Sequence, residues 1–204
     1  MELFKKYCLP SVQAQTFKDF DWWIMLDPTF PGLTAEYIAE LEEHAKILWL
    51  EADFQEDQAE VGPLLSDVYK DEWVCSTRVD SDDIMRNDFM EQMHEVATEE
   101  ESYITYRSGY MLKDGQVAVK QYARNPFCSY VEYASPFRSI FTVSHMQVHN
   151  QSVPLKIIED IPGWIQVDHG DNIKNKVSRK IHDFEAEKMD ASIAYTDFTW
   201  RRDS

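Results

Sequence analysis

The sequence predicts an α/β fold, with a mixed sheet flanked by helices. Helical and strand-like segments alternate over residues 2–98, and this pattern is typical of parallel strands covered by helices. In the second half, Asp114-Gly115 separates two strand-like runs and is a strong signal for a two-residue hairpin, which adds antiparallel pairs. We expect both halves to share one continuous sheet.

In the first half, apolar residues recur at helical spacing over 2–15, where Pro10 kinks or restarts the helix. The run from Phe20 to Leu26 is nearly all apolar and reads as a strand buried on both faces. Thr34 is placed to cap the helix that follows. The remaining expected elements are a helix over 35–45, a strand over 47–50, a short helix over 64–70, a strand over 73–79, and a helix of about 14 residues from Phe89.

In the second half, residues 103–113 and 116–122 form the expected hairpin. Residues 140–148 and 164–167 are expected as further strands, separated by Pro154 and Pro162. The chain beyond residue 175 is charged and predicted to be helical. We expect one domain over residues 1–178 and a charged helix or tail over 179–204.

Charge and composition exclude several classes of protein. Twenty Lys and Arg against 37 Asp and Glu give a net charge of −17, which argues against a nucleic-acid partner. Three dispersed cysteines without a CxxC pair suggest neither a zinc site nor a disulfide framework. The sequence holds no apolar run of about 18 residues and no secretory signal, so we expect no transmembrane segment and a cytoplasmic protein.

A carboxylate cluster follows the strand expected over 73–79. Asp80 and Asp82 are two residues apart, so in an extended segment their side chains point the same way. Open α/β sheets bind ligands at the carboxyl ends of their strands, and paired carboxylates suit Mg²⁺ or Mn²⁺. The alternative is structural, because Asp82 or Asp83 could cap the next helix while the others are solvated.

Three segments carry a resemblance to a known family. They are YCLPSVQAQT at 7–16 with IMLD at 24–27, RVDSDD at 78–83, and WIQVDHGDN at 164–172. Together they resemble the putative rhamnosyltransferase family, within the inverting nucleotide-sugar glycosyltransferases of the GT-A fold. The resemblance covers about residues 3 to 178 and implies a nucleotide-sugar half over 1–98 and an acceptor half over 99–178.

The resemblance implies roles for individual residues. Asp80, Asp82 and His169 match metal or diphosphate positions, and a structural role remains open for His169 and more so for His145. Arg78 could steady a phosphate or form a structural ion pair. The residues expected to contact the nucleotide sugar are Asp27, Arg78, Asp80, Asp83 and, on the acceptor side, Trp164.

One departure from the family pattern concerns the start of the sequence. Members normally have a β-strand before the first helix, and it forms the floor of the nucleotide pocket. Here Met1 lies at the helix itself, so we expect that strand to be absent or to lie outside this chain. Its absence would expose the edge of its neighbour and remove part of the base-binding wall, so that nucleotide affinity is reduced unless another segment compensates.

A transferase of this kind needs a base to deprotonate the acceptor hydroxyl. We favour Glu132 and Asp168, and the alternatives are Asp171 and the pair Glu159-Asp160. Trp164 is kept as an acceptor-side residue, although tryptophans within strands more often belong to the core.

The expected function is transfer of a sugar, rhamnose being the one that the family suggests, from a nucleotide-diphosphate donor to a saccharide or other hydroxyl acceptor, with Mn²⁺ or Mg²⁺. A non-catalytic protein of the same fold without a complete nucleotide pocket is the first alternative. A metal-dependent phosphodiesterase or nuclease that uses the same carboxylates is the second, and the acidic composition and the lack of a basic groove argue against it.

Overall fold

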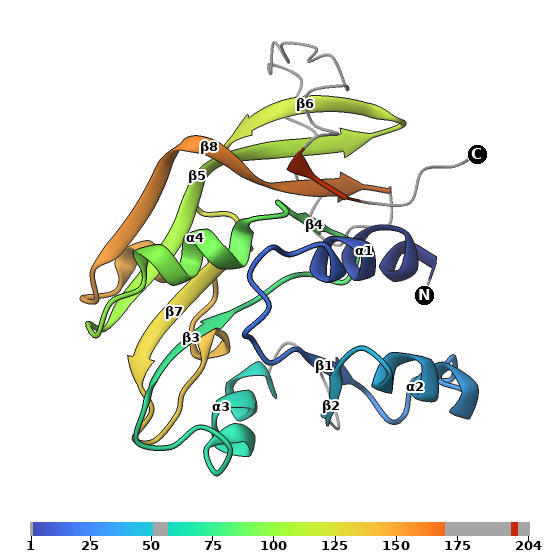
Figure 1. The fold of residues 1–204 in the computed structure, drawn as a ribbon, viewed down its shortest axis with the longest axis horizontal. Coiled ribbons are helices and arrows are strands. Elements are labelled where there is room, and N and C mark those ends of the chain that lie inside the picture. The colour runs from blue at the N-terminus through green and yellow to red at the C-terminus, as the bar shows by residue number, and fades with distance from the viewer. Residues whose placement is uncertain (1, 51–56, 170–196, 200–204) are drawn as a thin grey trace.

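The protein is an α/β structure in which helices flank a mixed, curled sheet (Figure 1). The structure is a computed structural model and describes residues 2–50, 57–169 and 197–199. The strands are β1 (Trp23–Leu26), β2 (Lys46–Trp49), β3 (Trp73–Thr77), β4 (Ile84–Met85), β5 (Ser102–Lys113), β6 (Gln116–Gln121), β7 (Cys128–Tyr133) and β8 (Leu155–Asp168). The α-helices are α1 (Leu9–Gln13), α2 (Ala35–Glu42), α3 (Val61–Leu65) and α4 (Phe89–Val96).

Short helical turns complete the described elements. A π-helix, η1 (Phe4–Cys8), runs directly into α1, so the expected helix over residues 2–15 is present with Pro10 in its first α-turn. The 3₁₀ turns are η2 (Asp57–Glu60), η3 (Ile140–Thr142) and η4 (Val148–Asn150). The prediction of a strand over residues 140–148 is therefore wrong, since the 3₁₀ turns η3 and η4 lie in this region instead.

The strands form two sheets rather than the single sheet expected from sequence. β1 and β2 make a parallel pair, whereas β3 belongs to a six-stranded sheet of order β3-β7-β5-β8-β4, with β6 paired to β5. Only the β5–β8 pair is parallel in this second sheet. The alternation of helices and strands correctly predicted β1, β2 and β3, but β3 pairs with the distant β7 and not with β1.

Local sequence signals account well for the short-range structure. The Thr34 side chain accepts a hydrogen bond from Tyr37 N and caps α2, as predicted. Asp114 and Gly115 both have positive φ, as a type I′ hairpin turn requires, and join β5 to β6. The helix after Phe89 is shorter than expected, because Ala97 is already extended.

β8 is longer than the strand expected near Trp164. It continues through Pro162, and its pairing with β5 becomes irregular between Tyr106 and Tyr110. A bulge of this kind tolerates a proline that has no N–H to donate.

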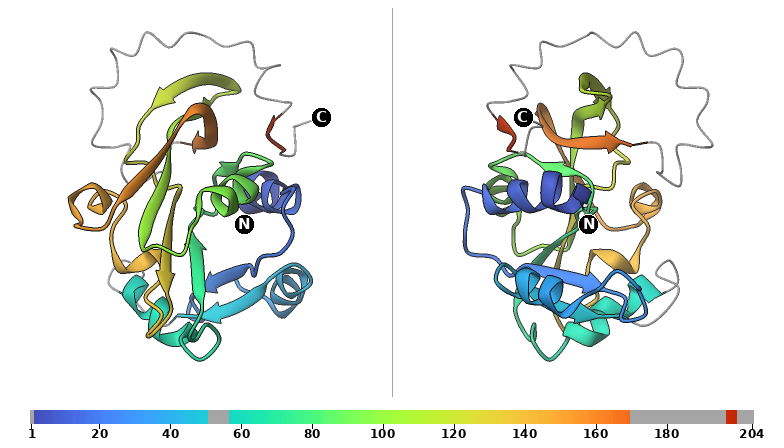
Figure 2. Two further views of the ribbon diagram at one scale, coloured as in Figure 1. Left: turned by 60° about the vertical axis from the view of Figure 1, so that its left-hand side comes forward. Right: turned by 90° about the vertical axis from the view of Figure 1, so that its right-hand side faces the viewer.

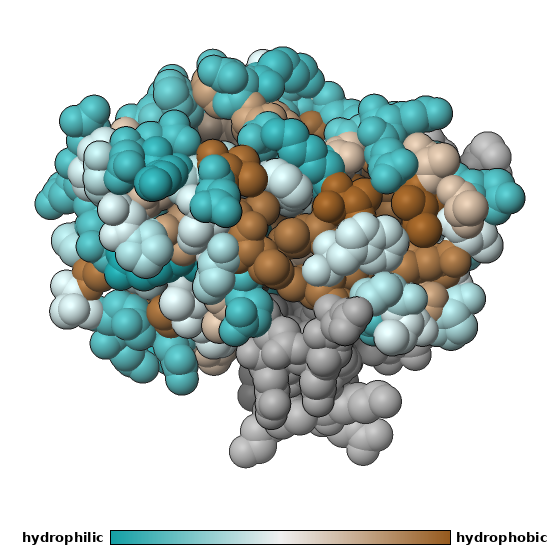
Figure 3. Space-filling model, turned by 90° about the horizontal axis from the view of Figure 1, so that it is seen from below, coloured by the Kyte–Doolittle hydropathy of each residue, from teal (hydrophilic) through white to brown (hydrophobic). Residues whose placement is uncertain are grey.

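Two apolar layers cover opposite faces of the β1–β2 pair. One contains Phe4, Val12 and Met93 from η1, α1 and α4, and Ile24 packs against it. The other contains residues of α3 and the loop after β7, and Trp23 packs against it. Figure 3 shows that hydrophobic residues also gather on the face seen from below, and Trp49, Leu64 and Val68 are among the large apolar side chains that are exposed.

The final described segment, residues 197–199, packs against the domain. Phe198 is buried beside Tyr110, forms a bridge with Arg86, and lies on the side of β4 in Figures 1 and 2. The remainder of the expected tail over 179–204 lies outside the described residues. In the part of the chain that is described, no helix combines the length and apolarity needed to cross a bilayer.

Candidate functional site

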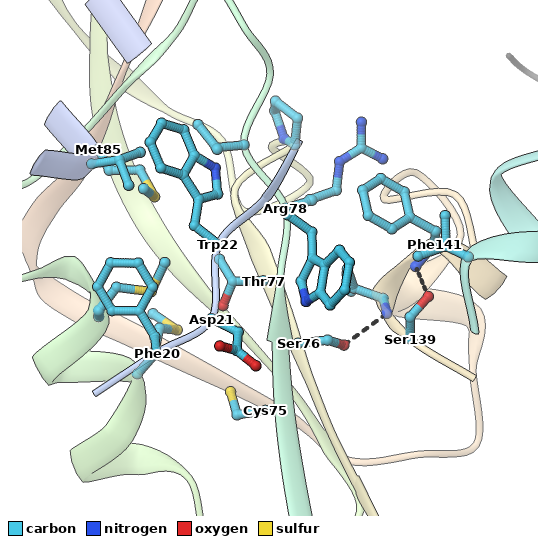
Figure 4. A pocket seen from close by; sticks show the side chains of 18 of the residues that line it. Phe20, Asp21, Trp22, Cys75, Ser76, Thr77, Arg78, Met85, Ser139 and Phe141 are labelled. Atoms are coloured by element: carbon cyan, nitrogen blue, oxygen red, sulfur yellow. Dashed lines mark hydrogen bonds between the residues drawn. The ribbon is translucent and has the colours of Figure 1, made fainter. Parts of the chain in front are cut away.

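A large cavity of about 2150 Å³ separates the β1–β2 pair from β3. Residues 22–25 line one wall and residues 73–82 line the other, so the segment that was singled out from sequence reaches the cavity. Figure 4 shows Phe20, Trp22 and Met85 on one side and the chain from Cys75 to Arg78 opposite them. Such a cavity exceeds the roughly 300–1,000 Å³ typical of a small-molecule site.

The carboxylate cluster forms a turn just after β3. Asp83 N donates to Asp80 O, and this turn places Asp80 and Asp82 on the cavity wall but directs Asp83 inward. Asp83 is 2% exposed and its carboxylate accepts a hydrogen bond from Val167 N of β8. Burial raises the pKa of Asp83 well above its usual value, and the charges of Asp82 and Asp80 raise it further. Asp83 therefore ties the turn to β8, and its burial corrects the expectation that it contacts the donor.

Asp82 and His169 come from segments 87 residues apart and meet at the cavity wall. His169 Nε2 lies 2.8 Å from Asp82 Oδ2, and both side chains are partly exposed. The contact follows from the fold, since His169 directly follows the carboxyl end of β8 and Asp82 lies in the turn after β3. The two sequence motifs thus converge on one site.

Arg78 lies beside this pair. Its guanidinium donates to Asp80 Oδ1 at 3.0 Å, its side chain is 11% exposed, and it stacks over Phe141 at 5.5 Å. Its buried Nε has no hydrogen-bond partner among the described residues. Arg78 therefore fixes the orientation of Asp80. This ion pair is the structural role that the sequence left open for Arg78.

The expected metal ligands are only partly assembled. Asp82 and His169 are in contact, whereas Asp80 is engaged by Arg78, and no group of three or more potential ligands converges among the described residues. Mg²⁺ commonly uses one or two protein carboxylates and completes its shell with phosphate oxygens and water. The Asp82–His169 pair fits a cation of that kind, completed by substrate.

Sequence reasoning missed Lys120, which lines the same cavity from β6. Its Nζ donates to Gln166 Oε1 at 2.6 Å and lies 5.8 Å from the ring centroid of Trp164. Burial lowers the pKa of Lys120, while Asp83 and Asp168 act in the opposite direction. No carboxylate of a described residue lies within ion-pair distance of Lys120. Nothing in the local sequence around Lys120, on a strand of a hairpin, indicates that its side chain reaches this cavity.

Asp27 lies away from the cavity wall. Its carboxylate accepts hydrogen bonds from Thr29 Oγ1 at 2.7 Å and from Thr29 N at 2.8 Å. Both bonds lower the pKa of Asp27, and the bond from the hydroxyl has the larger effect. Asp27 thus closes a turn after β1, and a contact with the nucleotide remains a prediction.

Glu132 does not lie where a catalytic base is needed. It is 0% exposed, on β7, and its oxygens accept hydrogen bonds from Arg138 N and Nε and from Ser139 N at 2.7–3.2 Å. A carboxylate without exposed surface cannot reach an acceptor hydroxyl. The expectation is corrected, and Glu132 holds the loop between β7 and η3.

The other base candidates among the described residues also lie apart from the cavity. Asp168 forms an ion pair with Lys113 at 2.9 Å and does not line the cavity wall. Glu159 is exposed and is held by both ends of the Arg107 guanidinium. Asp160, next to it, is also exposed. Asp171, the last base candidate, lies outside the described residues. His145, which was weighed as a metal or diphosphate ligand and not as a base, lines the cavity.

Trp164 belongs to the core. Its side chain is 0% exposed and stacks on Phe127 with ring centroids 5.3 Å apart, while Gly109 of β5 leaves room for the indole. The expectation that Trp164 stacks on an acceptor sugar is corrected, because no part of the ring reaches the cavity surface.

Comparison with known proteins agrees with the motif resemblance. No curated protein and no solved structure matches the chain. The model of the family described as "Putative rhamnosyl transferase" matches residues 1–181. This match includes the N-terminal helix, the Asp80–Asp83 turn and His169, so the chain belongs to the family described as putative rhamnosyl transferase.

Proposed function

We propose that the chain is an inverting glycosyltransferase of the GT-A type that moves a sugar, of the rhamnose class, from a nucleoside diphosphate to a hydroxyl acceptor. The contact between Asp82 and His169 carries this proposal. It brings two family motifs together at the carboxyl end of β3, where open α/β sheets bind their ligands.

Each residue of the site has a role in the proposed reaction. Asp82 and His169 would hold the Mn²⁺ or Mg²⁺ ion, and this ion neutralises charge on the departing diphosphate when bound. Lys120 contributes a positive charge to the same cavity for the phosphate oxygens. Arg78 keeps Asp80 oriented, and the proton of the acceptor hydroxyl passes to a carboxylate on the cavity wall.

A turnover assay tests the proposal directly. Purified protein is incubated with Mn²⁺ and with UDP-, GDP- and dTDP-linked sugars, and release of the nucleoside diphosphate is measured. We expect release from at least one donor and its loss in Asp82→Asn. The matched control is Asp67→Asn, because Asp67 is an exposed carboxylate that does not line the cavity.

The outcomes separate the alternatives. Binding of a nucleoside diphosphate without turnover would favour the non-catalytic relative. Cleavage of a simple phosphodiester without affinity for any nucleotide sugar would favour the phosphodiesterase.

A further inference from the structure

The turn that leads into η3 contains a residue in a strained backbone conformation. Ser139 has φ 67° and ψ 165°, a region that is populated almost only by glycine. Asp114 also has positive φ, but it lies in a hairpin turn, where such a value is ordinary. Ser139 is buried and lines the cavity. A strained residue of this kind persists only when its surroundings fix it, and such residues cluster at functional sites.

Hydrogen bonds to every polar group of Ser139 hold it in this conformation. Its N–H donates to the buried Glu132 Oε1 at 2.7 Å, and its carbonyl oxygen accepts from Thr142 Oγ1 at 2.6 Å. Its own hydroxyl oxygen accepts from Phe141 N at 3.3 Å and caps η3. The strained residue therefore determines how the first turn of η3 leaves the loop after β7.

The turn η3 docks on the strand that ends in the carboxylate cluster. Ile140 N donates to Ser76 Oγ of β3 at 2.8 Å, and the Ile140 side chain is buried. The next residue, Phe141, is partly buried, lines the cavity and places its ring centroid 5.5 Å from Cζ of Arg78 (Figure 4). The loop after β7 thus brings an aromatic face against the guanidinium that precedes Asp80.

The position of Arg78 depends on this aromatic face. One nitrogen of the guanidinium donates to Asp80 Oδ1 at 3.0 Å, whereas the buried Nε has no hydrogen-bond partner among the described residues. Attraction between a cation and an aromatic ring is strongest where water is excluded, and Arg78 is nearly buried. Asp80 is partly exposed, so water competes for its carboxylate. The ion pair with Asp80 therefore requires Phe141 to hold the guanidinium in place.

We propose that Phe141 is a positioning residue of the donor site, and that the strained turn at Ser139 holds its ring against Arg78. This inference rests on the proposed function. With Arg78 in place, the charge of Asp80 is paired, so the cavity wall beside Asp82 repels a diphosphate less. Without the ring, the guanidinium is free to move and Asp80 becomes an uncompensated charge near the phosphates. This effect is electrostatic and does not need the metal ion.

Calorimetric titration of Phe141 variants tests the proposal. The probe is whichever of UDP, GDP and dTDP binds the wild type most tightly. Phe141→Leu keeps an apolar side chain but removes the aromatic face, and we expect it to weaken binding about tenfold. The loss should be the same with and without Mn²⁺, which separates positioning from loss of a metal ligand. Phe141→Tyr keeps the ring and should restore the affinity of the wild type.

The matched control is Phe17→Leu. Phe17 is also a partly buried phenylalanine that lines the cavity, but its ring stacks on His94 with centroids 4.6 Å apart. We expect this variant to bind the nucleoside diphosphate as the wild type does. Circular dichroism confirms that all variants are folded.

Nuclear magnetic resonance of the arginine side chains gives a second measurement that needs no donor. The Nε–H resonance of Arg78 is identified by its loss in Arg78→Lys. Because the guanidinium lies over the Phe141 ring, we expect this resonance to be shifted upfield in the wild type and in Phe141→Tyr. In Phe141→Leu it should return to the position of an ordinary arginine.

The outcomes distinguish this inference from the proposed function. Equal affinity of the wild type and Phe141→Leu would overturn the inference alone, as would a loss of affinity confined to Mn²⁺. An Arg78 resonance at the same position in the wild type and Phe141→Leu would also overturn it, because the ring would then not hold the guanidinium. No binding of UDP, GDP or dTDP to the wild type would overturn the inference together with the proposed function.

Discussion

Replacing Glu132 by glutamine tests whether this carboxylate supports the fold rather than the chemistry. Its two oxygens accept from three donors, which are Arg138 N, Arg138 Nε and Ser139 N. Glutamine keeps one carbonyl oxygen, which can retain the short bond from Ser139 N, but its amide NH₂ then faces the donors of Arg138.

The magnitude follows from the bonds that are lost. A hydrogen bond to a charged group contributes about 1.5–3 kcal/mol. The side chain of Arg138 is 46% exposed, so water can replace the partner of its Nε, whereas the backbone N–H is less accessible. We therefore expect Glu132→Gln to lower the free energy of unfolding by about 2–3 kcal/mol.

Urea unfolding followed by tryptophan fluorescence measures this change. Glu100→Gln is the control, since Glu100 is exposed and is expected to change stability by less than about 0.5 kcal/mol. Unfolding of Glu132→Gln at the urea concentration of the wild type would show that this carboxylate does not support the fold. A loss of turnover at unchanged stability would restore Glu132 as the base.

Three further predictions concern the core, the pH dependence of stability and the donor site. Gly109→Ala should destabilise the protein by about 1–3 kcal/mol in urea unfolding, because the new Cβ would lie 2.1 Å from the Trp164 ring. The pKa of Glu101 is lowered, first by a hydrogen bond from Tyr130 and then by a guanidinium. The stabilising effect of ionised Glu101 is therefore complete above the usual pKa of 4.5 and is lost as the pH falls through the lowered pKa of the folded state. Glu101→Gln should therefore make the unfolding free energy less dependent on pH in the acid range. Lys120→Gln should weaken nucleoside diphosphate binding about tenfold in calorimetry without changing stability.

Each of these has an outcome that contradicts it. A core that repacks around the new methyl group would leave Gly109→Ala as stable as the wild type. An unchanged slope between about pH 6 and pH 3 in Glu101→Gln would remove that carboxylate from the acid response. Equal affinity of Lys120→Gln and the wild type would place Lys120 outside the donor site.

Local signals in the sequence were sufficient for much of the first half and for the hairpin turn of the second. The cap at Thr34, the hairpin turn at Asp114-Gly115 and the apolar runs of β1 to β3 each depend on neighbouring residues, and the structure confirms them. The carboxylate cluster at Asp80–Asp83 was also noticed, because carboxylates after an apolar strand are conspicuous, but it was expected in an extended segment and the structure has a turn there.

Long-range contacts were not available from such signals. The pairing of β3 with β7 and the path of β8 through Pro162 depend on residues far apart in sequence. Glu132 and Trp164 were assigned to the site by residue type and by their position along the sequence, whereas the structure packs Glu132 against Arg138 and Trp164 against Phe127. Lys120 was missed for the converse reason, since only the fold brings β6 to the cavity.

The most direct test of the donor site is calorimetric titration of nucleoside diphosphates with and without Mn²⁺. We expect Mn²⁺ to raise the affinity of the wild type for at least one of UDP, GDP and dTDP by about tenfold or more, and Asp82→Asn to remove this enhancement. Equal affinities with and without the ion, or an enhancement that persists in Asp82→Asn, would contradict the assignment of Asp82 and His169 as the metal-binding pair.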